Sequence, residues 1–591
     1  MPEHGTLDLS RRRVLQGAAA GTAALSAPTL YGAGAFSSAN AYADAPVLGT
    51  YDVVVVGCGA AGMTAALTAA ARGLSVVVVE KAPTFGGSAA RSGAGIWIPN
   101  NSVILAAGVP DTPALAAEYL AAVVGNGSTP ARQNAFLSNG PAMLSFVMAH
   151  SPCRFVWMNG YSDYYPELPG GMPGGRSIEP DVIDGHILGA ELANLNPAYL
   201  PVPAGLVVFS QDYKWINLAA VNAKGTAVAA QAAARGTAAA LAGQKPLTMG
   251  QSLATGLRAG LMQAGVPVLL NTPLTDLNIV NGSAAGIVVT QNGAPGLINA
   301  RRGVIVGSGG FEHNAAMRAQ YQQQPIGTTW SVGAKENTGD GILAGQRAGA
   351  ALALMDDAWW GPTIPSGDGP YFCLAERTLP GGLIVNQAGH RFVDEAAPYV
   401  DVVHRMYQQN GTAPDIPAWL IIDQNFRDRY VFRDILPTLP FPDSWYQNGS
   451  VYKDLTLWGL AGQIGVSPSA LTNTVTHFNG LAYAGRDTDF GRGVSVYDHY
   501  YTDPAILPNS CLAPLWLAPF YALRIVPGDL GTKGGMVTDE RARVLRSDGS
   551  VIPKLYAAGN ASAAVMGQSY AGAGSTIGPA MTFGYIAGND I

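Results

Sequence analysis

Charged residues are scarce in this chain of 591 residues: Asp, Glu, Lys and Arg make up 13% of it, about half the usual share in soluble proteins. Hydrophobic residues make up 48%, which indicates a folded chain with a large interior and little disorder. The net charge of −6 lacks the basic excess of nucleic-acid-binding proteins, so we expect no nucleic-acid partner. A chain of this length is too long for one core and suits two large domains.

Cysteine and histidine are also few, and neither occurs in a metal-binding pattern. The eight histidines show no HExxH pattern, so we predict no metal site. The four cysteines are scattered without a CxxC spacing; they are Cys58, Cys153, Cys373 and Cys511. Disulfide formation stays open, because nothing in the spacing requires a pairing.

The apolar run near the N-terminus is too short and too rich in alanine for a convincing membrane anchor. It follows three arginines, Arg11–Arg13, and a small-residue cleavage option, Ala39-Asn40-Ala41, comes after it. This arrangement resembles a twin-arginine export signal, although a basic start of this kind also arises by chance. We assign residues 1–45 to that signal and expect a protein exported to the periplasm or cell envelope, folded around a cofactor before export.

The next segment has the order of a dinucleotide-binding unit. An apolar strand, Val53–Val56, leads into glycines at 57, 59 and 62, then an alanine-rich helix and a second strand that ends at Glu80. In this motif the glycines allow a tight turn, a close approach to a pyrophosphate and close helix packing, and the acid accepts hydrogen bonds from a ribose. The predicted contacts are Gly57, Gly59, Ala60, Ala61, Gly62, Glu80 and Lys81.

A second glycine-rich loop, residues 81–95, follows the acid directly. It resembles the loop that runs along FAD in the fumarate reductase and ketosteroid dehydrogenase group of flavoproteins. The stretch holds no histidine for covalent attachment, so we expect non-covalent FAD. The resemblance implies further FAD contacts at Gly87, Ser88, Ser92, Gly93, Leu274, Asp340, Gly559 and Asn560.

The resemblance covers about 45–355 and 530–591, so it implies an α/β fold with one FAD-binding domain built from two chain segments. We assign 46–355 and 531–591 to this Rossmann-like domain and 356–530 to an inserted mixed α/β catalytic cap. Residues 160–250 are rich in Gly and Pro loops, which is typical of a lid.

Three tyrosine-bearing segments carry a narrower resemblance. "GYSDYYPE", "APYVDVVHRMY" and "YAGAGSTIGPAMTFGY" closely resemble segments of 3-ketosteroid Δ1-dehydrogenases, and so does the stretch from 531 to 567. In relatives the last motif usually reads Tyr-Pro-Gly-Pro-Gly; here Ala571 and Ala573 replace both prolines, which leaves the shape of this loop open.

The resemblance implies a role for each residue. The Tyr570 hydroxyl and the Gly574 N–H hold the 3-ketone, Tyr399 removes the proton from carbon 2, and Tyr164 assists Tyr399. Tyr165 is the alternative to Tyr164. The hydride on carbon 1 then goes to flavin N5, and a helix begun by Ser575, Thr576 and Ile577 points its positive end at the flavin.

Three other functions stay open. A carboxylate reductase resembling fumarate reductase would clamp a dicarboxylate with cationic side chains of the middle region, for which Arg377, His390, Arg391 and His404 are available. A 3-ketosteroid Δ4-dehydrogenase would share the ketone clamp but place its base differently. A secreted flavin- or steroid-binding protein would show no turnover.

The resemblance and the sequence also predict the substrate, the electron acceptor and a membrane contact. We expect a 3-ketosteroid substrate, with tolerance of a side chain on carbon 17, within steroid degradation. The electron acceptor is expected to be a quinone or similar carrier, because no second GxGxxG motif for NAD is present. The apolar loop 199–209 has no obvious core partner in the sequence, which suggests peripheral membrane contact.

Overall fold

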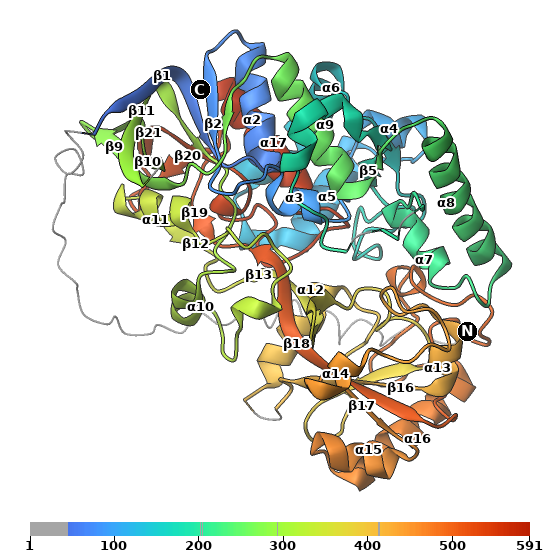
Figure 1. Ribbon diagram of the computed structural model, residues 1–591. Helices are drawn as coiled ribbons and strands as arrows, with labels where there is room; N and C mark the ends of the chain where they lie inside the picture. The colour runs from blue at the N-terminus through green and yellow to red at the C-terminus, as the bar shows by residue number, and fades with distance from the viewer. Residues whose placement is uncertain (1–44, 201, 204, 292, 412–413) are drawn as a thin grey trace, which may run out of the picture.

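The computed structural model describes residues 45–591 except 201, 204, 292 and 412–413. The predicted export signal therefore lies outside the described residues apart from Ala45. Two lobes make up the described chain: an upper one around a mainly parallel sheet and a lower one around an antiparallel sheet (Figure 1).

The sheet of the upper lobe has eight strands, with the path β20-β21-β11-β1-β2-β8 and β9 and β10 attached to it. The four valines 53–56 in β1 pair in parallel with β2 on one side and β11 on the other, which explains why the run is wholly apolar. The strands are β1 (Val47–Val56), β2 (Val76–Val79), β8 (Val268–Leu269), β9 (Leu274–Val280), β10 (Ser283–Gln291), β11 (Ala294–Val306), β20 (Arg543–Leu545) and β21 (Val551–Ala557).

Both ends of the described chain contribute to this lobe. Strand β21 pairs in parallel with β11, and the last helix, α17 (Ile577–Asp590), packs along α2 (Ala60–Ala71) (Figure 1). The other long helices here are α5 (Pro113–Val124), α6 (Pro130–His150) and α9 (Met249–Gln263). The predicted α/β fold class is confirmed.

The lower lobe, which we call the cap, has its own six-stranded sheet. The strands are β13 (Ala358–Ser366), β14 (Gly369–Phe372), β15 (Gly382–Val385), β16 (Ala418–Asp423), β17 (Val451–Asp454) and β18 (Phe520–Thr532). The helices are α12 (Tyr399–Gln409), α13 (Gln424–Arg429), α14 (Asp443–Gln447), α15 (Leu457–Ile464) and α16 (Pro468–Ala484). Strands β13 and β18 pair antiparallel and run from the cap toward the upper lobe (Figure 1).

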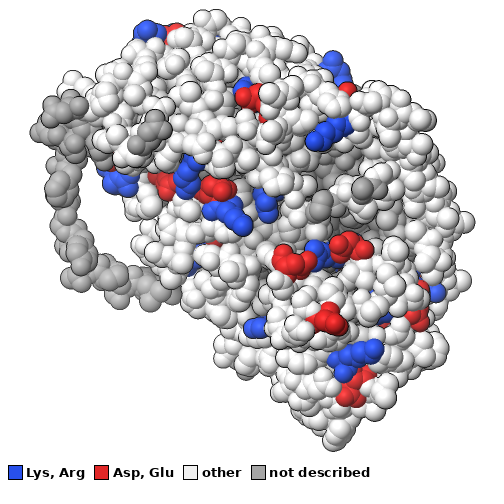
Figure 2. Space-filling view, viewed as in Figure 1, with Lys and Arg blue, Asp and Glu red and all other residues white. Residues whose placement is uncertain are grey.

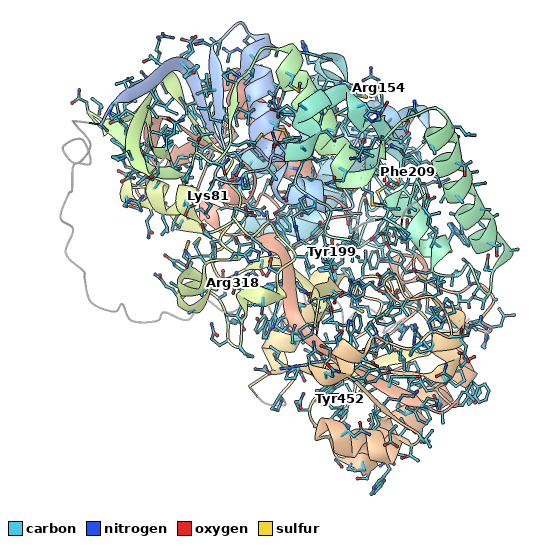
Figure 3. The ribbon with its side chains drawn as sticks, viewed as in Figure 1. Lys81, Arg154, Tyr199, Phe209, Arg318 and Tyr452 are labelled. Carbon is cyan, nitrogen blue, oxygen red and sulfur yellow. The ribbon has the colours of Figure 1, made fainter. Side chains whose placement is uncertain are left out.

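The region expected to form a lid combines irregular chain with short elements. Among its described residues, the long helix is α8 (Ala223–Leu241), preceded by α7 (Tyr213–Ile216). Tyr199 joins the two lobes: its N–H donates to the carbonyl of Arg91 at 3.1 Å, and its hydroxyl donates to the carbonyl of Pro370 at 2.9 Å. Figure 3 shows Tyr199 between the upper lobe and the cap.

The surface matches the low share of charge. Lys, Arg, Asp and Glu occupy only scattered positions on the face shown in Figure 2. All four cysteines are buried and free. Within the described residues, no three His, Cys, Asp or Glu side chains are grouped as metal ligands would be, and none of the helices there has the length and apolar character of a membrane span.

Candidate active site

A cavity of about 920 Å³ is lined by residues of the main sheet, the lid region and the cap. Most of the predicted FAD contacts lie in its wall. They are Gly57, Gly59, Ala60, Ala61, Glu80, Lys81, Gly87, Ser88, Ser92, Gly93, Leu274, Asp340, Gly559, Asn560, Thr576 and Ile577. Sixteen positions scattered over 520 residues of sequence thus converge on one space.

Two predicted contacts do not line the cavity. A Cβ atom on Gly62 would lie 1.9 Å from the carbonyl oxygen of Gly57, so this glycine allows the helix to pack on the turn rather than touching a ligand. Ser575 is fully buried, and its hydroxyl accepts the N–H of Gly572 at 2.9 Å. Its side chain thus serves the loop itself, and a contact between Ser575 and the cofactor stays a prediction.

Glu80, the acidic residue after the second strand, is held in place by backbone N–H groups. The Glu80 carboxylate accepts the N–H of Cys58 at 2.8 Å and that of Ala82 at 2.9 Å. Removal from bulk water raises the pKa of Glu80, and these two N–H groups oppose that rise. Next to it, the Lys81 ammonium pairs with Asp340 at 2.6 Å, and Asp340 is the first residue of α11 (Asp340–Arg347).

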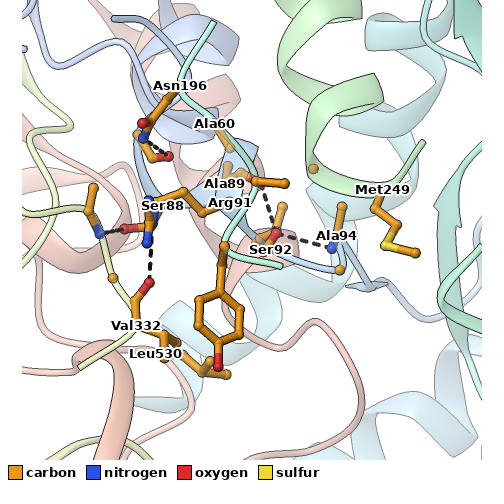
Figure 4. A pocket seen from close by; sticks show the side chains of 18 of the residues that line it. Ala60, Ser88, Ala89, Arg91, Ser92, Ala94, Asn196, Met249, Val332 and Leu530 are labelled. Atoms are coloured by element: carbon orange, nitrogen blue, oxygen red, sulfur yellow. Dashed lines mark hydrogen bonds between the residues drawn. The ribbon is translucent and has the colours of Figure 1, made fainter. Parts of the chain in front are cut away.

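The second glycine-rich loop is fixed along the cavity by its own side chains (Figure 4). The Ser92 hydroxyl donates to the carbonyl of Ala89 at 2.8 Å and accepts the N–H of Ala94 at 3.0 Å. The Arg91 guanidinium donates to the carbonyl of Val332 at 3.3 Å. A rigid loop of this kind, the open space at Gly59 and the ribose-binding position of Glu80 together fit FAD.

Replacing Gly59 by alanine tests this fit. A Cβ on Gly59 meets no atom of the protein within 4 Å, so Gly59→Ala should fold normally but obstruct a pyrophosphate at the turn. We expect at least a tenfold loss of FAD affinity, measured as flavin-to-protein ratio and by fluorescence titration of the apoprotein. The matched control is Gly462→Ala in α15, where a Cβ also meets open space; equal FAD affinity in both variants would contradict the assignment.

Three predicted catalytic tyrosines meet in the same cavity. Tyr164, Tyr399 and Tyr570 are 2%, 4% and 3% exposed. The Tyr164 hydroxyl donates to the Tyr399 oxygen at 3.1 Å. The ring centroid of Tyr570 lies 5.2 Å from each of the other two rings. Tyr399 is the first residue of α12, directly after Pro398.

The hydroxyl groups of Tyr164 and Tyr165 have different partners, which favours Tyr164 as the assisting residue. Tyr165 donates to the Asp401 carboxylate at 3.1 Å and does not line the cavity. Tyr164 reaches Tyr399 instead. Neighbouring residues on a loop point in different directions, so the sequence alone left both open.

The loop after Tyr570 is held in place without its two prolines. The carbonyl of Ala571 accepts the N–H of Tyr164 at 3.0 Å and the hydroxyl of Tyr119 at 2.6 Å. Gly574 has φ of +97°, and a Cβ there would lie 2.1 Å from the carbonyl oxygen of Gly95. Only glycine fits this close approach, so tertiary contacts replace the stiffness that proline gives.

The ketone clamp expected at this loop has converging atoms. The Tyr570 hydroxyl lies 3.0 Å from the Thr576 hydroxyl. Burial raises the pKa of Tyr570, and contacts with Thr576, Tyr399 and the Gly574 N–H lower it. The phenol therefore remains protonated at neutral pH and can act as a hydrogen-bond donor.

Tyr399 is in a different electrostatic position. Burial is the main cause that raises its pKa well above 10, and the hydrogen bond from Tyr164 acts in the opposite direction. A donor aimed at the phenol oxygen stabilises the charged form, so the hydrogen bond from Tyr164 favours a Tyr399 phenolate.

Aromatic side chains surround these tyrosines, and this arrangement was not predicted from the sequence. Phe372 meets the Tyr399 ring edge-on at 5.2 Å, and Trp359 meets the Tyr570 ring edge-on at 5.2 Å. Tyr161 stacks on Tyr500 at 3.8 Å. The only available signal for Tyr161 was its place in the "GYSDYYPE" segment.

The cationic side chains available for a dicarboxylate clamp are engaged elsewhere. Arg377 donates to the backbone carbonyls of Glu395 and Ala397, and Arg391 pairs with Glu395 and Asp487. Neither arginine lines the cavity, and neither do His390 and His404. The walls near the tyrosines therefore suit an apolar ring system better than a dicarboxylate.

Comparisons with known proteins identify the family of the chain. The model of the "FAD binding domain" family matches residues 52–577. A 3-oxosteroid 1-dehydrogenase of Mycolicibacterium smegmatis is 52% identical over 92% of this chain and 97% of its own length. One from Mycobacterium tuberculosis is 53% identical over 91% of this chain and 97% of its own.

A solved structure extends the likeness to the fold. The 3-ketosteroid Δ1-dehydrogenase of Sterolibacterium denitrificans, crystallised with 1,4-androstadiene-3,17-dione, superposes with a TM-score of 0.87 at 40% identity. The match covers 92% of this chain and 99% of that one. This chain belongs to the FAD-dependent 3-oxosteroid 1-dehydrogenase family.

Proposed function

We propose that the protein oxidises 3-keto-4-ene steroids to 3-keto-1,4-dienes. The observation that carries this proposal is the Tyr164–Tyr399 hydrogen bond beside Tyr570 and Gly574 in one cavity. The names of the relatives, 3-oxosteroid 1-dehydrogenases, support the same reaction.

Four residues of the chain have separate roles in the proposed reaction. The Tyr570 hydroxyl and the Gly574 N–H donate to the 3-ketone oxygen and stabilise the negative charge that develops on it. Polarising the ketone makes the carbon-2 proton more acidic. Tyr399 takes this proton, while Tyr164 donates to the Tyr399 oxygen. Bound FAD supplies the acceptor for the hydride from carbon 1.

The further parts of the proposal concern the setting of the enzyme. Residues 1–45 are the basis for export through the twin-arginine route, and the absence of a second dinucleotide motif favours a quinone or similar electron acceptor.

The loop 199–209, which was expected to contact a membrane, does not support such a contact. Its Val207 and Val208 are buried, and its residues Leu200, Leu206 and Val207 line the cavity wall.

The part of the cavity wall formed by this loop concerns the size of the steroid that can bind. Because the loop lines the cavity and its Tyr199 bonds to Pro370 of β14, whose Phe372 contacts the Tyr399 ring, we include steroids with a side chain on carbon 17, as in sterol degradation, in the proposal. Titration series of 3-keto-4-ene steroids with and without this side chain compare their affinities directly.

An anaerobic titration tests the reaction itself. We expect a 3-keto-4-ene steroid to bleach the visible flavin band of the purified protein, with a 1,4-diene identified by mass spectrometry. Failure of every ketosteroid to bleach the flavin, with reoxidation of reduced flavin by fumarate, would instead identify a carboxylate reductase. Bleaching only by steroids saturated between carbons 4 and 5 would identify a Δ4-dehydrogenase.

A further inference from the structure

A buried ion pair lies behind the tyrosines and takes no part in the chemistry described above. Lys533 follows strand β18 and is 0% exposed, and its ammonium lies 3.0 Å from the Asp357 carboxylate. Neither residue lines the cavity. Burying an ion pair brings little net stability because both charges lose their water, so its place in the fold calls for another reason.

Lys533 contacts the segment that carries Tyr570. Its ammonium donates to the carbonyl of Ser569, the residue before Tyr570, at 3.2 Å. It also lies 4.9 Å from the centre of the Trp359 ring, and the edge of that ring contacts Tyr570. Trp359 is fixed in turn by donating to Asn560 at 3.0 Å. Tyr570 is thus supported from its backbone and from its ring.

Asp357 contacts the helix that carries Tyr399. His404, on α12, lies with its Nε2 2.8 Å from Asp357 Oδ1, and Trp360 donates to the same oxygen at 2.6 Å. The contacts with Lys533 and His404 lower the pKa of Asp357 to about 2, so the carboxylate is charged at every working pH. Asp356 and Asp401 are the other charged groups near Lys533.

We propose that Lys533 is a positioning residue for the dehydrogenation: paired with Asp357, it sets the spacing between the ketone clamp at Tyr570 and the base at Tyr399. The chain of contacts runs from Ser569 through Lys533, Asp357 and His404 to α12. It spans both segments whose tyrosine rings lie 5.2 Å apart. The inference rests on the proposed function for its kinetic consequence, but the spacing itself does not depend on the substrate.

Misplacement by about 1 Å can cost a hundredfold in rate, which gives the size of the expected effect. Lys533→Met keeps most of the apolar side chain but leaves the buried Asp357 carboxylate without its ammonium partner. The double variant Lys533→Met/Asp357→Asn removes both charges, and the new amide can still accept from His404 and Trp360. We therefore compare the two variants by melting temperature and by the rate of flavin reduction per bound flavin.

We expect the double variant to recover most of the stability that Lys533→Met loses, while its rate per bound flavin stays about 10- to 100-fold below wild type. The isotope effect with steroid deuterated at carbon 2 should rise, because proton transfer is the step that needs the spacing. Full recovery of the rate in the double variant would overturn the proposal, since only the Asp357 charge left without its ammonium partner would then have been harmful.

A matched pair controls for the loss of a buried ion pair as such. Arg391 and Asp487 are 3% and 0% exposed at their side chains and lie 2.9 Å apart in the cap, where Arg391 contacts the rings of Phe478 and Phe490. Arg391→Met/Asp487→Asn should lower the melting temperature but leave the rate per bound flavin unchanged. A rate loss equal to that of the Lys533 variants would contradict a specific role.

A crystal structure of the Lys533→Met/Asp357→Asn protein separates this inference from the proposed reaction. A shift of the Tyr399–Tyr570 ring separation away from 5.2 Å supports the positioning role whether or not ketosteroids reduce the flavin. An unchanged separation overturns it, even where wild-type protein turns over steroid normally.

Discussion

Replacing Tyr399 by phenylalanine should lower the rate of flavin reduction by 3-keto-4-ene steroids about 10²- to 10⁴-fold, the usual contribution of a general base. The ring that contacts Phe372 and Tyr570 stays in place, so steroid affinity should change little. Anaerobic stopped-flow spectroscopy at saturating steroid measures the rate, and a titration of the flavin spectrum measures the affinity.

The pH dependence gives the same variant a second readout. Burial raises the pKa of Tyr399 well above 10, so the fraction of phenolate, and with it the wild-type rate, should increase about tenfold per pH unit across the neutral and weakly alkaline range. Tyr399→Phe should lose this slope. A rate that is independent of pH in wild type would indicate that another group removes the proton.

The matched control for Tyr399→Phe is Tyr165→Phe. Tyr165 is a neighbour of Tyr164 on the same loop, but its hydroxyl bonds to Asp401 rather than to Tyr399. We expect its rate of flavin reduction to stay within about twofold of wild type. A loss as large as that of Tyr399→Phe would mean that the Asp401 side of the loop takes part in the reaction.

The parts of this site that could be predicted from the sequence are those formed by residues close together in the chain. The strand Val53–Val56, the glycine turn and Glu80 form one continuous unit, so pattern alone placed them. Asp340 and Tyr399 are the first residues of their helices. Here neighbours in the chain decide the structure.

Features that depend on distant segments could not be predicted. The Lys533–Asp357 pair joins the residue just after β18 to the residue just before β13, far apart in sequence, and no pattern of spacing marks it. The rigidity of the loop after Tyr570 comes from Tyr119 and Tyr164, which compensates for the missing prolines.

Replacing Tyr570 by phenylalanine should lower the rate of flavin reduction about 10²- to 10³-fold, or roughly 3–4 kcal/mol, as expected for the loss of one donor to a developing oxyanion. The Gly574 N–H remains as the second donor, so the loss should be incomplete. Because burial raises the pKa of Tyr570, its phenol keeps the proton across the working range. The variant should therefore retain the wild-type pH slope, in contrast to Tyr399→Phe.

Exchange of the carbon-2 hydrogen with deuterated solvent separates the two tyrosines further. In Tyr399→Phe the exchange should disappear with the base, whereas in Tyr570→Phe it should persist at a reduced rate because the base remains and only the polarisation of the ketone is weakened. The control is Tyr556→Phe, whose hydroxyl bonds to Asp590 outside the cavity and whose loss should leave exchange unchanged. Loss of exchange in Tyr570→Phe together with loss of the pH slope would exchange the two roles, making Tyr570 the base and Tyr399 part of the clamp.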